Sequence, residues 1–327
     1  MNGPAKKSEP LHEVTIQLLV MFGLLAILFI GVTVINNNFV SVFSLRAVSR
    51  DVAIMSLFAL GQAVVIMSGG IDLSVGSLMC FLGALTIVIV NSATGVPFVV
   101  IAIGILTLAG MIGAIHALFI TKLNLQPFLV TLCSLLIFRG LARVLTQDST
   151  VAFVATEHPT FTALGSGSWL HIPIPVFILI GVLIPLGVFL HFTVPGRYIY
   201  AIGYNVEAAR YSGVRVHLLQ GVSYVICAVL AAVAGLLEAS DVGSVTPSNA
   251  AMAYEMYGIT AAVLGGCALR GGQGSLLGVV VGAAILRTIR SAVIFVGIST
   301  YWTFAVTGLV LLAAVTTDAL VRRKRGD

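Results

Sequence analysis

The chain has 327 residues, of which 59% are hydrophobic and only 9% are charged, and its formal net charge is +5. Since a soluble domain carries roughly 25% charged residues, this composition excludes an ordinary soluble protein and predicts an integral membrane protein. Helices are expected to cross the membrane, because the apolar runs are continuous and lack the alternation of barrel strands. The basic balance of such a chain indicates its orientation and does not indicate a nucleic-acid partner.

The fold class predicted from the apolar runs is all-α, with about ten transmembrane segments of roughly 20 residues each. In chain order they are expected near residues 17–35, 52–68, 74–92, 98–120, 126–146, 173–193, 217–238, 257–269, 275–296 and 302–320. The eighth is too short to cross alone, so we expect it to begin earlier, near Ala250. The first run, Leu18 to Ile35, is too long for the apolar part of a signal peptide and predicts a retained helix. Pro185 should kink the sixth helix.

The basic residues predict the orientation. With the N-terminus in the cytoplasm, eleven of the seventeen Lys and Arg residues lie on the cytoplasmic side, namely Lys6, Lys7, Lys122, Arg197, Arg210, Arg215, Arg270, Arg322, Arg323, Lys324 and Arg325. The outer loops then hold only Arg46 and Arg50, so both termini are expected inside. The chain is thereby divided into a cytoplasmic tail at 1–16, a transmembrane domain at 17–320 and a basic cytoplasmic tail at 321–327.

Two connections between the segments are long. The first, 147–172, is expected in the periplasm, and the second, 194–216, in the cytoplasm. The second is the one cytoplasmic feature large enough to dock a soluble partner. Within it, Asn205 is expected to cap a short helix that has Glu207 in its first turn and ends at Gly213. On these residues alone, a solvated connector is the alternative.

No catalytic or metal-binding pattern is found in the sequence. The lysines are Lys6, Lys7, Lys122 and Lys324, and none follows a glycine, which excludes a nucleotide-binding P-loop. The six histidines form no i,i+4 pair, and His116 stands alone in an apolar helix, where a packing role is favoured over a ligand role. The four cysteines lie in apolar segments at wide spacing and are expected to be small buried side chains. We therefore expect no catalytic residue, no metal site and no cofactor in this chain.

Seven ionisable residues fall within or near the predicted helices: Asp72, Arg139, Arg143, Glu238, Asp241, Arg287 and Arg290. A charge at the centre of a helix in lipid costs about 2.5–3.5 kcal/mol. Arg139, Arg143, Glu238 and Asp241 lie near predicted outer ends, where their side chains can reach water. Arg287 and Arg290 share one face of the ninth helix. They are expected either to face a polar cavity or a partner subunit, or to form a buried structural pair.

Two glycine-rich stretches interrupt the apolar pattern, M-S-G-G-I-D-L-S-V-G-S at 67–77 and L-G-G-C-A-L-R-G-G-Q-G-S-L-L-G-V-V-V-G-A at 264–283. Glycine permits a positive φ and a close approach of helices, as at Gly278 and Gly282. The stretches are either ordinary tight loops or broken, closely packed elements that frame a pathway. Both are followed by helices that run the same way, so their short likeness predicts no inverted repeat.

Asp72 is expected in the turn between the second and third helices, on the cytoplasmic side. There its charge costs little, and Asp72 or Ser74 can cap the third helix. Gly69 and Gly70 give this turn its conformational freedom.

Five stretches carry a family resemblance: 67–77, T-K-L-N-L-Q-P-F-L-V-T-L…R-G-L-A-R-V-L-T (121–146), G-R-Y-I-Y-A-I-G-Y-N-V-E-A-A-R-Y-S-G-V (196–214), Y-E-M-Y-G-I-T-A-A-V-L-G-G (254–266) and G-G-Q-G-S-L-L-G (271–278). Together they resemble the permease subunits of ribose/xylose/galactose-type ABC importers, in the same order over nearly the whole chain. The chain departs from that pattern at Arg270, in G-G-C-A-L-R-G-G where relatives often have G-G-T-S-L-S-G-G. It departs again at Arg287 and Arg290, where relatives often carry asparagines. These departures leave the sugar undetermined.

The resemblance implies a transport subunit that is not itself an enzyme, in a bacterial inner membrane. Its implied partners are a periplasmic sugar-binding protein, a second permease chain in a homo- or heterodimer, and a cytoplasmic ATP-binding-cassette subunit that holds the ATP and Mg. The implied coupling loop contacts the ATPase through Gly203, Asn205, Glu207, Ala208, Ala209 and Gly213. The implied translocation or gating signature is Gly69, Gly70, Asp72, Ser74, Gly76, Gly265, Gly266, Gly271 and Gly272. An ion-coupled transporter is the alternative, disfavoured by the lack of midplane carboxylates. A membrane enzyme is disfavoured by the lack of a nucleophile–base or metal pattern.

Overall fold

The computed structural model describes residues 11–92, 95–154 and 158–297, together with residues 299, 301, 302, 305, 306, 308, 309, 312 and 316, and side chains are described from residue 18. The predicted C-terminal tail, 321–327, lies outside the described residues, as do the first ten residues of the predicted N-terminal tail. Only scattered residues of the predicted tenth segment, 302–320, are described.

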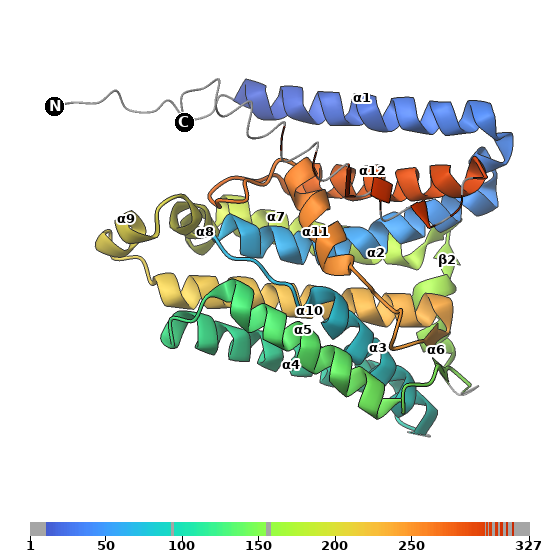
Figure 1. Cartoon of the computed structure of the whole chain (residues 1–327), viewed down its shortest axis with the longest axis horizontal. Helices are drawn as coiled ribbons and strands as arrows, with labels where there is room; N and C mark the ends of the chain where they lie inside the picture. Colours follow the sequence, from blue (N-terminus) through green and yellow to red (C-terminus); the bar gives the residue numbers. More distant parts are fainter. Residues whose placement is uncertain are drawn as a thin grey trace.

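The described residues form an all-α bundle of long helices that lie nearly side by side (Figure 1). The helices are α1 (Leu11–Ile35), α2 (Val42–Met67), α3 (Val75–Ser92), α4 (Phe98–Ala117), α5 (Pro127–Leu145), α6 (Pro159–Ser166), α7 (Ile174–Phe192), α8 (Val194–Tyr204), α9 (Val206–Tyr211), α10 (Val216–Val242), α11 (Tyr254–Leu264) and α12 (Leu276–Phe295). A 3-10 turn covers Asn37–Val40, and a π-helical turn, Leu118–Lys122, extends α4. Among the described residues, eight helices are long and apolar enough to cross a membrane.

The four strands are two residues long and form two small antiparallel pairs. They are β1 (Val151–Ala152), β2 (Ser168–Trp169), β3 (Ile172–Pro173) and β4 (Ser244–Val245). β1 pairs with β4, and β2 pairs with β3. The predicted periplasmic loop, 147–172, is therefore a folded element that also contains α6. The backbone N–H of Gly165 in α6 donates to the Ser240 hydroxyl on α10 at 2.8 Å, which fixes this loop to the bundle.

Helix α2 begins ten residues before the predicted start at 52. The Ser41 hydroxyl accepts a hydrogen bond from the backbone N–H of Ser44 at 3.2 Å and caps the helix at its true start. Arg46 and Arg50, predicted in an outer loop, therefore lie within α2. The guanidinium of Arg50 pairs with the Asp241 carboxylate on α10 at 2.7 Å, and this pairing lets the charged turns remain helical at the edge of the bundle.

Helix α2 is the centre of the core. Every residue from Ala53 to Met67 is buried. α10 lies close against it because Gly61 has no side chain: a Cβ there would lie 3.0 Å from the Cα of Cys227. Small residues at such contacts let backbones approach where lipid removes the usual hydrophobic drive for helix association. α1 lies at the outside of the bundle against α12, with most of its described side chains exposed.

Two irregular segments interrupt the helical bundle, and we call them the first break (residues 68–74) and the second break (residues 243–253). The first break leads from α2 into α3, and the second leads from α10 into α11. At about 1.5 Å per residue, the 11-residue helix α11 is only about 16 Å long. The prediction that this eighth segment begins near Ala250 is wrong, because Ala251 and Ala253 have φ of 50° and 62° and cannot continue a helix.

The helix after the first break runs parallel to α10. Met79 lies against Gly235, and Gly83 lies against Ala239 one turn further along both helices. α10 itself is antiparallel to α2, since Asp241 near its end pairs with Arg50 near the start of α2.

Helix α11, which follows the second break, packs on α2 in the same way that α3 packs on α10. Tyr254 stacks on Phe58 with 5.2 Å between ring centroids, and Gly258 lies against Gln62, so α11 runs parallel to α2. α4 packs on α10, and α12 packs correspondingly on α2. The units α2–α3–α4 and α10–α11–α12 thus form an inverted repeat. The likeness in sequence between 67–77 and 264–283 did not predict this repeat. In the structure, the segment that corresponds to the first break is the second break.

Candidate functional site

The predicted cytoplasmic loop, 194–216, contains two helices where one was expected. Thr193 caps α8 by accepting a hydrogen bond from the backbone N–H of Gly196 at 3.2 Å. Asn205 caps α9, as predicted, by accepting from the backbone N–H of Ala208 at 3.0 Å. Gly213, with φ of 81°, ends the turn after α9. The run T-V-P-G at 193–196, a cap followed by a helix-starting proline, is the signal by which α8 could have been found.

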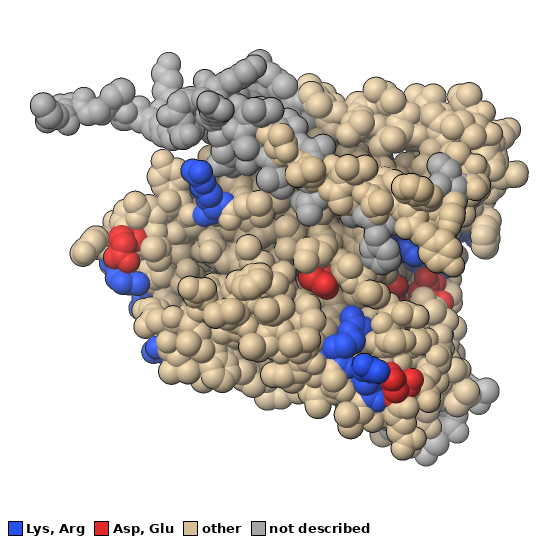
Figure 2. Space-filling model, in the orientation of Figure 1, with Lys and Arg blue, Asp and Glu red and all other residues tan. Residues whose placement is uncertain are grey.

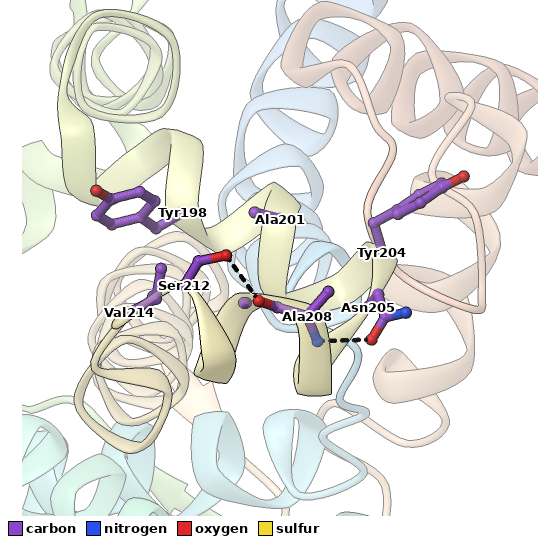
Figure 3. A pocket seen from close by; sticks show the side chains of 8 residues that line it. Tyr198, Ala201, Tyr204, Asn205, Ala208, Ser212 and Val214 are labelled. Atoms are coloured by element: carbon purple, nitrogen blue, oxygen red, sulfur yellow. Dashed lines mark hydrogen bonds between the residues drawn. The ribbon is translucent and has the colours of Figure 1, made fainter. Parts of the chain in front are cut away.

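A shallow groove of about 340 Å³ lies on α8 and α9 (Figure 3). Its floor is made of small residues, among them Ala201 and Ala208, and Tyr198 and Tyr204 stand at its sides. Ala208 is exposed toward the groove, whereas Ala209 is buried and anchors α9 to the bundle. Glu207 is exposed on α9, with its carboxylate 3.4 Å from the Arg210 guanidinium. The groove therefore presents an apolar, aromatic surface beside an exposed pair of opposite charges.

Three segments far apart in the sequence meet beneath this groove, at what we call the glycine junction: Met67, Gly69, Gly203, Gly271 and Gly272. A Cβ on Gly203 would collide with the carbonyl of Met67 and the backbone nitrogen of Gly272. A Cβ on Gly271 would lie 2.9 Å from the Cα atoms of both Gly203 and Gly69. The backbone N–H of Gly272 donates to the Met67 carbonyl at 3.0 Å. The junction joins the end of α8 to the first break and to the loop after α11.

Asp72 lies in the interior, so its predicted position in a water-facing turn is wrong. Its side chain is 1% exposed. One carboxylate oxygen, Oδ1, accepts hydrogen bonds from the backbone N–H of Ser74 at 2.8 Å and from the Ser74 hydroxyl at 2.7 Å. Asp72 therefore fixes Ser74, the residue before α3, and these two hydrogen bonds do not reach a backbone N–H of the helix itself. The carboxylate itself lies in a buried environment, whereas the predicted turn placed it near water.

The second oxygen of Asp72, Oδ2, faces a buried polar cluster. It lies 3.9 Å from Nδ1 of His116 on α4, and Nε2 of His116 is 2.8 Å from the hydroxyl of Ser134 on α5. The Tyr224 hydroxyl on α10 lies against Gly70. Among the described residues, no hydrogen-bond partner is found for Oδ2 of Asp72, Nδ1 of His116 or the Tyr224 hydroxyl. The first break is thus surrounded by polar side chains from α4, α5 and α10. Sequence reasoning had placed His116 in a packing role and had not singled out Ser134 or Tyr224.

The other signature glycines mark close contacts between helices. A Cβ on Gly265 would lie 2.5 Å from the backbone of Gly278, which confirms that α11 and α12 approach closely at Gly278. Gly266 follows directly in the same turn. Gly76, the second residue of α3, faces Glu255, the second residue of α11. The stretches 67–77 and 264–283 are therefore broken, closely packed elements rather than ordinary tight loops.

Arg287 and Arg290 occupy different surroundings although both lie on α12. The Arg287 side chain is 7% exposed, and its guanidinium lies 5.6 Å from the centre of the Tyr254 ring. Its Nη2 reaches the Tyr254 hydroxyl at 3.5 Å, and this hydroxyl donates to the Glu238 carboxylate at 3.0 Å. Arg287 thus belongs to a structural network inside the chain, whereas Arg290 is exposed.

The remaining charged residues were predicted near the outer ends, with access to water. Arg143 is exposed there and pairs with Asp148 at 2.6 Å. Because Arg143 donates hydrogen bonds to it, the pKa of Asp148 is lowered. Arg139 instead turns inward, and its Nη1 donates to the carbonyls of Pro247 and Ala250 at 2.8 Å each. Among the four free cysteines, Cys80, Cys227 and Cys267 are buried as predicted, whereas Cys133 is exposed.

Comparison with known proteins gives a consistent result over almost the whole chain. Residues 44–315 match the family model described as "Branched-chain amino acid transport system / permease component". The ribose import permease protein RbsC of Escherichia coli K12 is 36% identical over 295 residues, which cover 90% of this chain and 91% of that protein. RbsC of Bacillus subtilis 168 is 36% identical over 294 residues, 90% of each chain. The L-arabinose transport system permease protein AraH of E. coli K12 is 34% identical over 298 residues, 91% of this chain and 89% of that protein.

No solved structure matches the chain. The extent of the family match, the identity to these relatives and the eight membrane-crossing helices in the described residues agree with one another. The chain is a multi-pass protein of a bacterial inner membrane and belongs to the branched-chain amino acid transport system / permease component family.

Proposed function

We propose that the chain is the membrane-spanning permease subunit of an ABC importer and that it carries a monosaccharide from the periplasm to the cytoplasm. Three relatives are named for ribose or L-arabinose, and they match over about nine-tenths of the chain. A sugar of this kind is the substrate that their names favour. The family description itself names branched-chain amino acids, so the substrate class rests on the sequence relatives.

The chain works with three partners in this proposal. An ATP-binding-cassette subunit holds ATP and Mg and hydrolyses the nucleotide, because no lysine here follows a glycine and a P-loop is excluded. A periplasmic binding protein delivers the sugar, and a second permease chain completes the path. The exposed Arg290 is available to line the path or to contact that second chain.

The ATPase docks on the groove of α8 and α9 and acts through the glycine junction. This junction carries the proposal, because Gly203 at the end of α8 is in backbone contact with both glycine-rich loops. Without side chains in between, a displacement of α8 must move the first break and the loop after α11. The nucleotide cycle then shifts the population between inward-open and outward-open states.

The test is uptake by the complete complex in lipid vesicles. Labelled ribose and L-arabinose are supplied with the cognate binding protein outside and ATP inside. Uptake of either sugar that requires ATP and survives collapse of the proton gradient is expected. Uptake that continues without ATP and stops when the gradient collapses would show an ion-coupled transporter instead. Transport of a branched-chain amino acid with neither sugar carried would overturn the substrate class alone.

A further inference from the structure

The two helices that follow the breaks meet in the interior of the bundle. In Figure 1, α3 and α11 both begin near the middle of the molecule. A Cβ on Gly76 in α3 would lie 2.5 Å from the carboxylate oxygen Oε2 of Glu255 in α11 and 2.6 Å from the carbonyl of Ala251 in the second break. The Glu255 carboxylate therefore lies at the first turn of α3, where the helix dipole stabilises negative charge.

Arg139 on α5 binds the second break close to the point where α3 and α11 meet. Its guanidinium donates to the carbonyls of Pro247 and Ala250, and the thiol of Cys80 on α3 lies 3.8 Å from the same Pro247 carbonyl. Arg139 and Glu255 are both only partly buried, so each keeps some surface for a further contact. The segment between them is strained, since Ala251 and Ala253 have positive φ without being glycine. Strain of this kind costs about 1–3 kcal/mol per residue and gathers at functional sites.

Arg139 lies on the membrane-crossing helix α5 and Glu255 on the short helix α11, and both side chains are partly buried. Arg139 is six residues from the end of α5, about 9 Å along the helix. Figure 2 shows acidic and basic side chains over the middle of this face, between α12 and α5. Ionisable residues at such depth face a water-filled path or another chain. Gln62 adds a second polar group beside α11: it is fully buried, and neither amide atom has a partner among the described residues. Such a group needs water or a ligand.

The chemistry of the meeting point fits a neutral polyhydroxylated molecule. A carboxylate accepts hydrogen bonds from hydroxyl groups, and a guanidinium donates to hydroxyl oxygens. The positive charge of Arg139 is balanced by Glu255, so no excess positive charge is left for a sugar phosphate or sugar acid. In transporters built from inverted repeats, substrate sites lie at the repeat interface near interrupted helices.

We propose that Glu255 and Arg139 form a substrate-contact site for a neutral sugar at the meeting point of α3 and α11. The inference rests on the proposed function and deepens it, because it names residues in the path and the charge class of the substrate. After it leaves the binding protein, the sugar replaces its hydrogen bonds to water with hydrogen bonds to Glu255 and Arg139. It then moves toward the cytoplasm when the two breaks change conformation.

The first experiment compares variants in the complete complex in vesicles. Glu255→Gln keeps the size of the side chain but removes its charge, and Asp148→Asn is the matched control in the exposed Arg143 pair. We expect Glu255→Gln to lower sugar uptake about tenfold. Asp148→Asn should leave both sugar uptake and ATP hydrolysis near wild type. Wild-type uptake by Glu255→Gln would overturn the proposal. A wild-type complex that carries no sugar would instead refute the proposed function.

The second experiment distinguishes contact from a structural role. Glu255→Cys is made in a Cys133→Ser background, which removes the exposed native thiol. We expect a water-soluble methanethiosulfonate cation to label the new thiol in the complex. Labelling should slow when the sugar-loaded binding protein and ATP are present, compared with sugar-free binding protein. A thiol that reacts with a lipid-soluble maleimide but never with the water-soluble reagent would place this side chain in lipid and overturn the proposal.

Discussion

Gly203 at the end of α8 and Gly271 in the loop after α11 pack backbone against backbone, and a side chain at either position would have no room. The contact links the surface that we propose for the ATPase to the elements that we propose for the gate. Flexible side chains would absorb a displacement, whereas direct backbone contact transmits it.

Gly203→Ala should disrupt the glycine junction. The added Cβ meets the backbone of Met67 and Gly272, which cannot move away as a flexible side chain would. Overpacking of this kind costs about 1–3 kcal/mol. We expect a lower unfolding temperature in detergent and a large loss of ATP-driven uptake. The control is Gly104→Ala, at a helical position with open space around it. A Gly203→Ala protein as stable and active as this control would rule out tight packing at the junction.

Glu207→Arg should uncouple the ATPase from transport. Glu207 is exposed on α9 and pairs only loosely with Arg210, so the change leaves the core intact but reverses a charge at the proposed docking surface. Rim charges affect association more than folding. We expect normal insertion and thermal stability, with uptake lost while ATP hydrolysis continues without sugar. Normal uptake by this variant would show that the ATPase docks elsewhere.

Asp72→Asn should retain transport, because the Asn side-chain oxygen can still accept from Ser74. Asp72→Ala removes both hydrogen bonds to Ser74 and should destabilise the chain by about 1–3 kcal/mol, because the backbone N–H and the hydroxyl of the buried Ser74 lose their partner. Uptake and thermal unfolding of the two variants are measured side by side. If Asp72→Asn is as inactive as Asp72→Ala, the negative charge beside His116 is required and the hydrogen bonds to Ser74 alone are not enough.

Arg287→Gln and Arg290→Gln should differ in stability. Replacing the buried Arg287 removes its contacts with the hydroxyl and the ring of Tyr254, and a buried polar group left without its partner costs about 1–3 kcal/mol. Arg290 is exposed, so its change should leave thermal unfolding nearly unchanged and alter uptake or subunit association instead. Equal unfolding temperatures for the two variants would contradict the internal role of Arg287.

Much of the fold follows from local pattern. The apolar runs predicted the bundle, and the residues around Asn205 predicted the capped helix α9, because caps and spans depend on near neighbours in sequence. The burial of Asp72 could not be predicted in this way. It depends on His116 and Tyr224, which come from helices far along the chain. The start of α2 was missed because Arg50 looked like a loop charge until Asp241 was seen to pair with it.

The inverted repeat was invisible for a related reason. Its halves share a pattern of helix packing, with Gly76 and Glu255 each second in the helix after a break, but these two matched residues differ in type. The likeness in sequence lies instead between the two glycine-rich loops, because both need glycine where backbones pack closely. The repeat is recognised from the contacts between α3 and α10 and between α11 and α2, and these contacts are known only from the structure.

The units α2–α3–α4 and α10–α11–α12 point in opposite directions, so within the repeat each face of the membrane meets elements of the same kind. If each half adopts the conformation of the other, an outward-open form becomes an inward-open one with contacts of the same kind. The free-energy difference between them is then set by positions where the halves differ. A modest external bias suffices to reverse so small a difference. In the proposed importer, the partner proteins that bind each face would therefore supply the directionality.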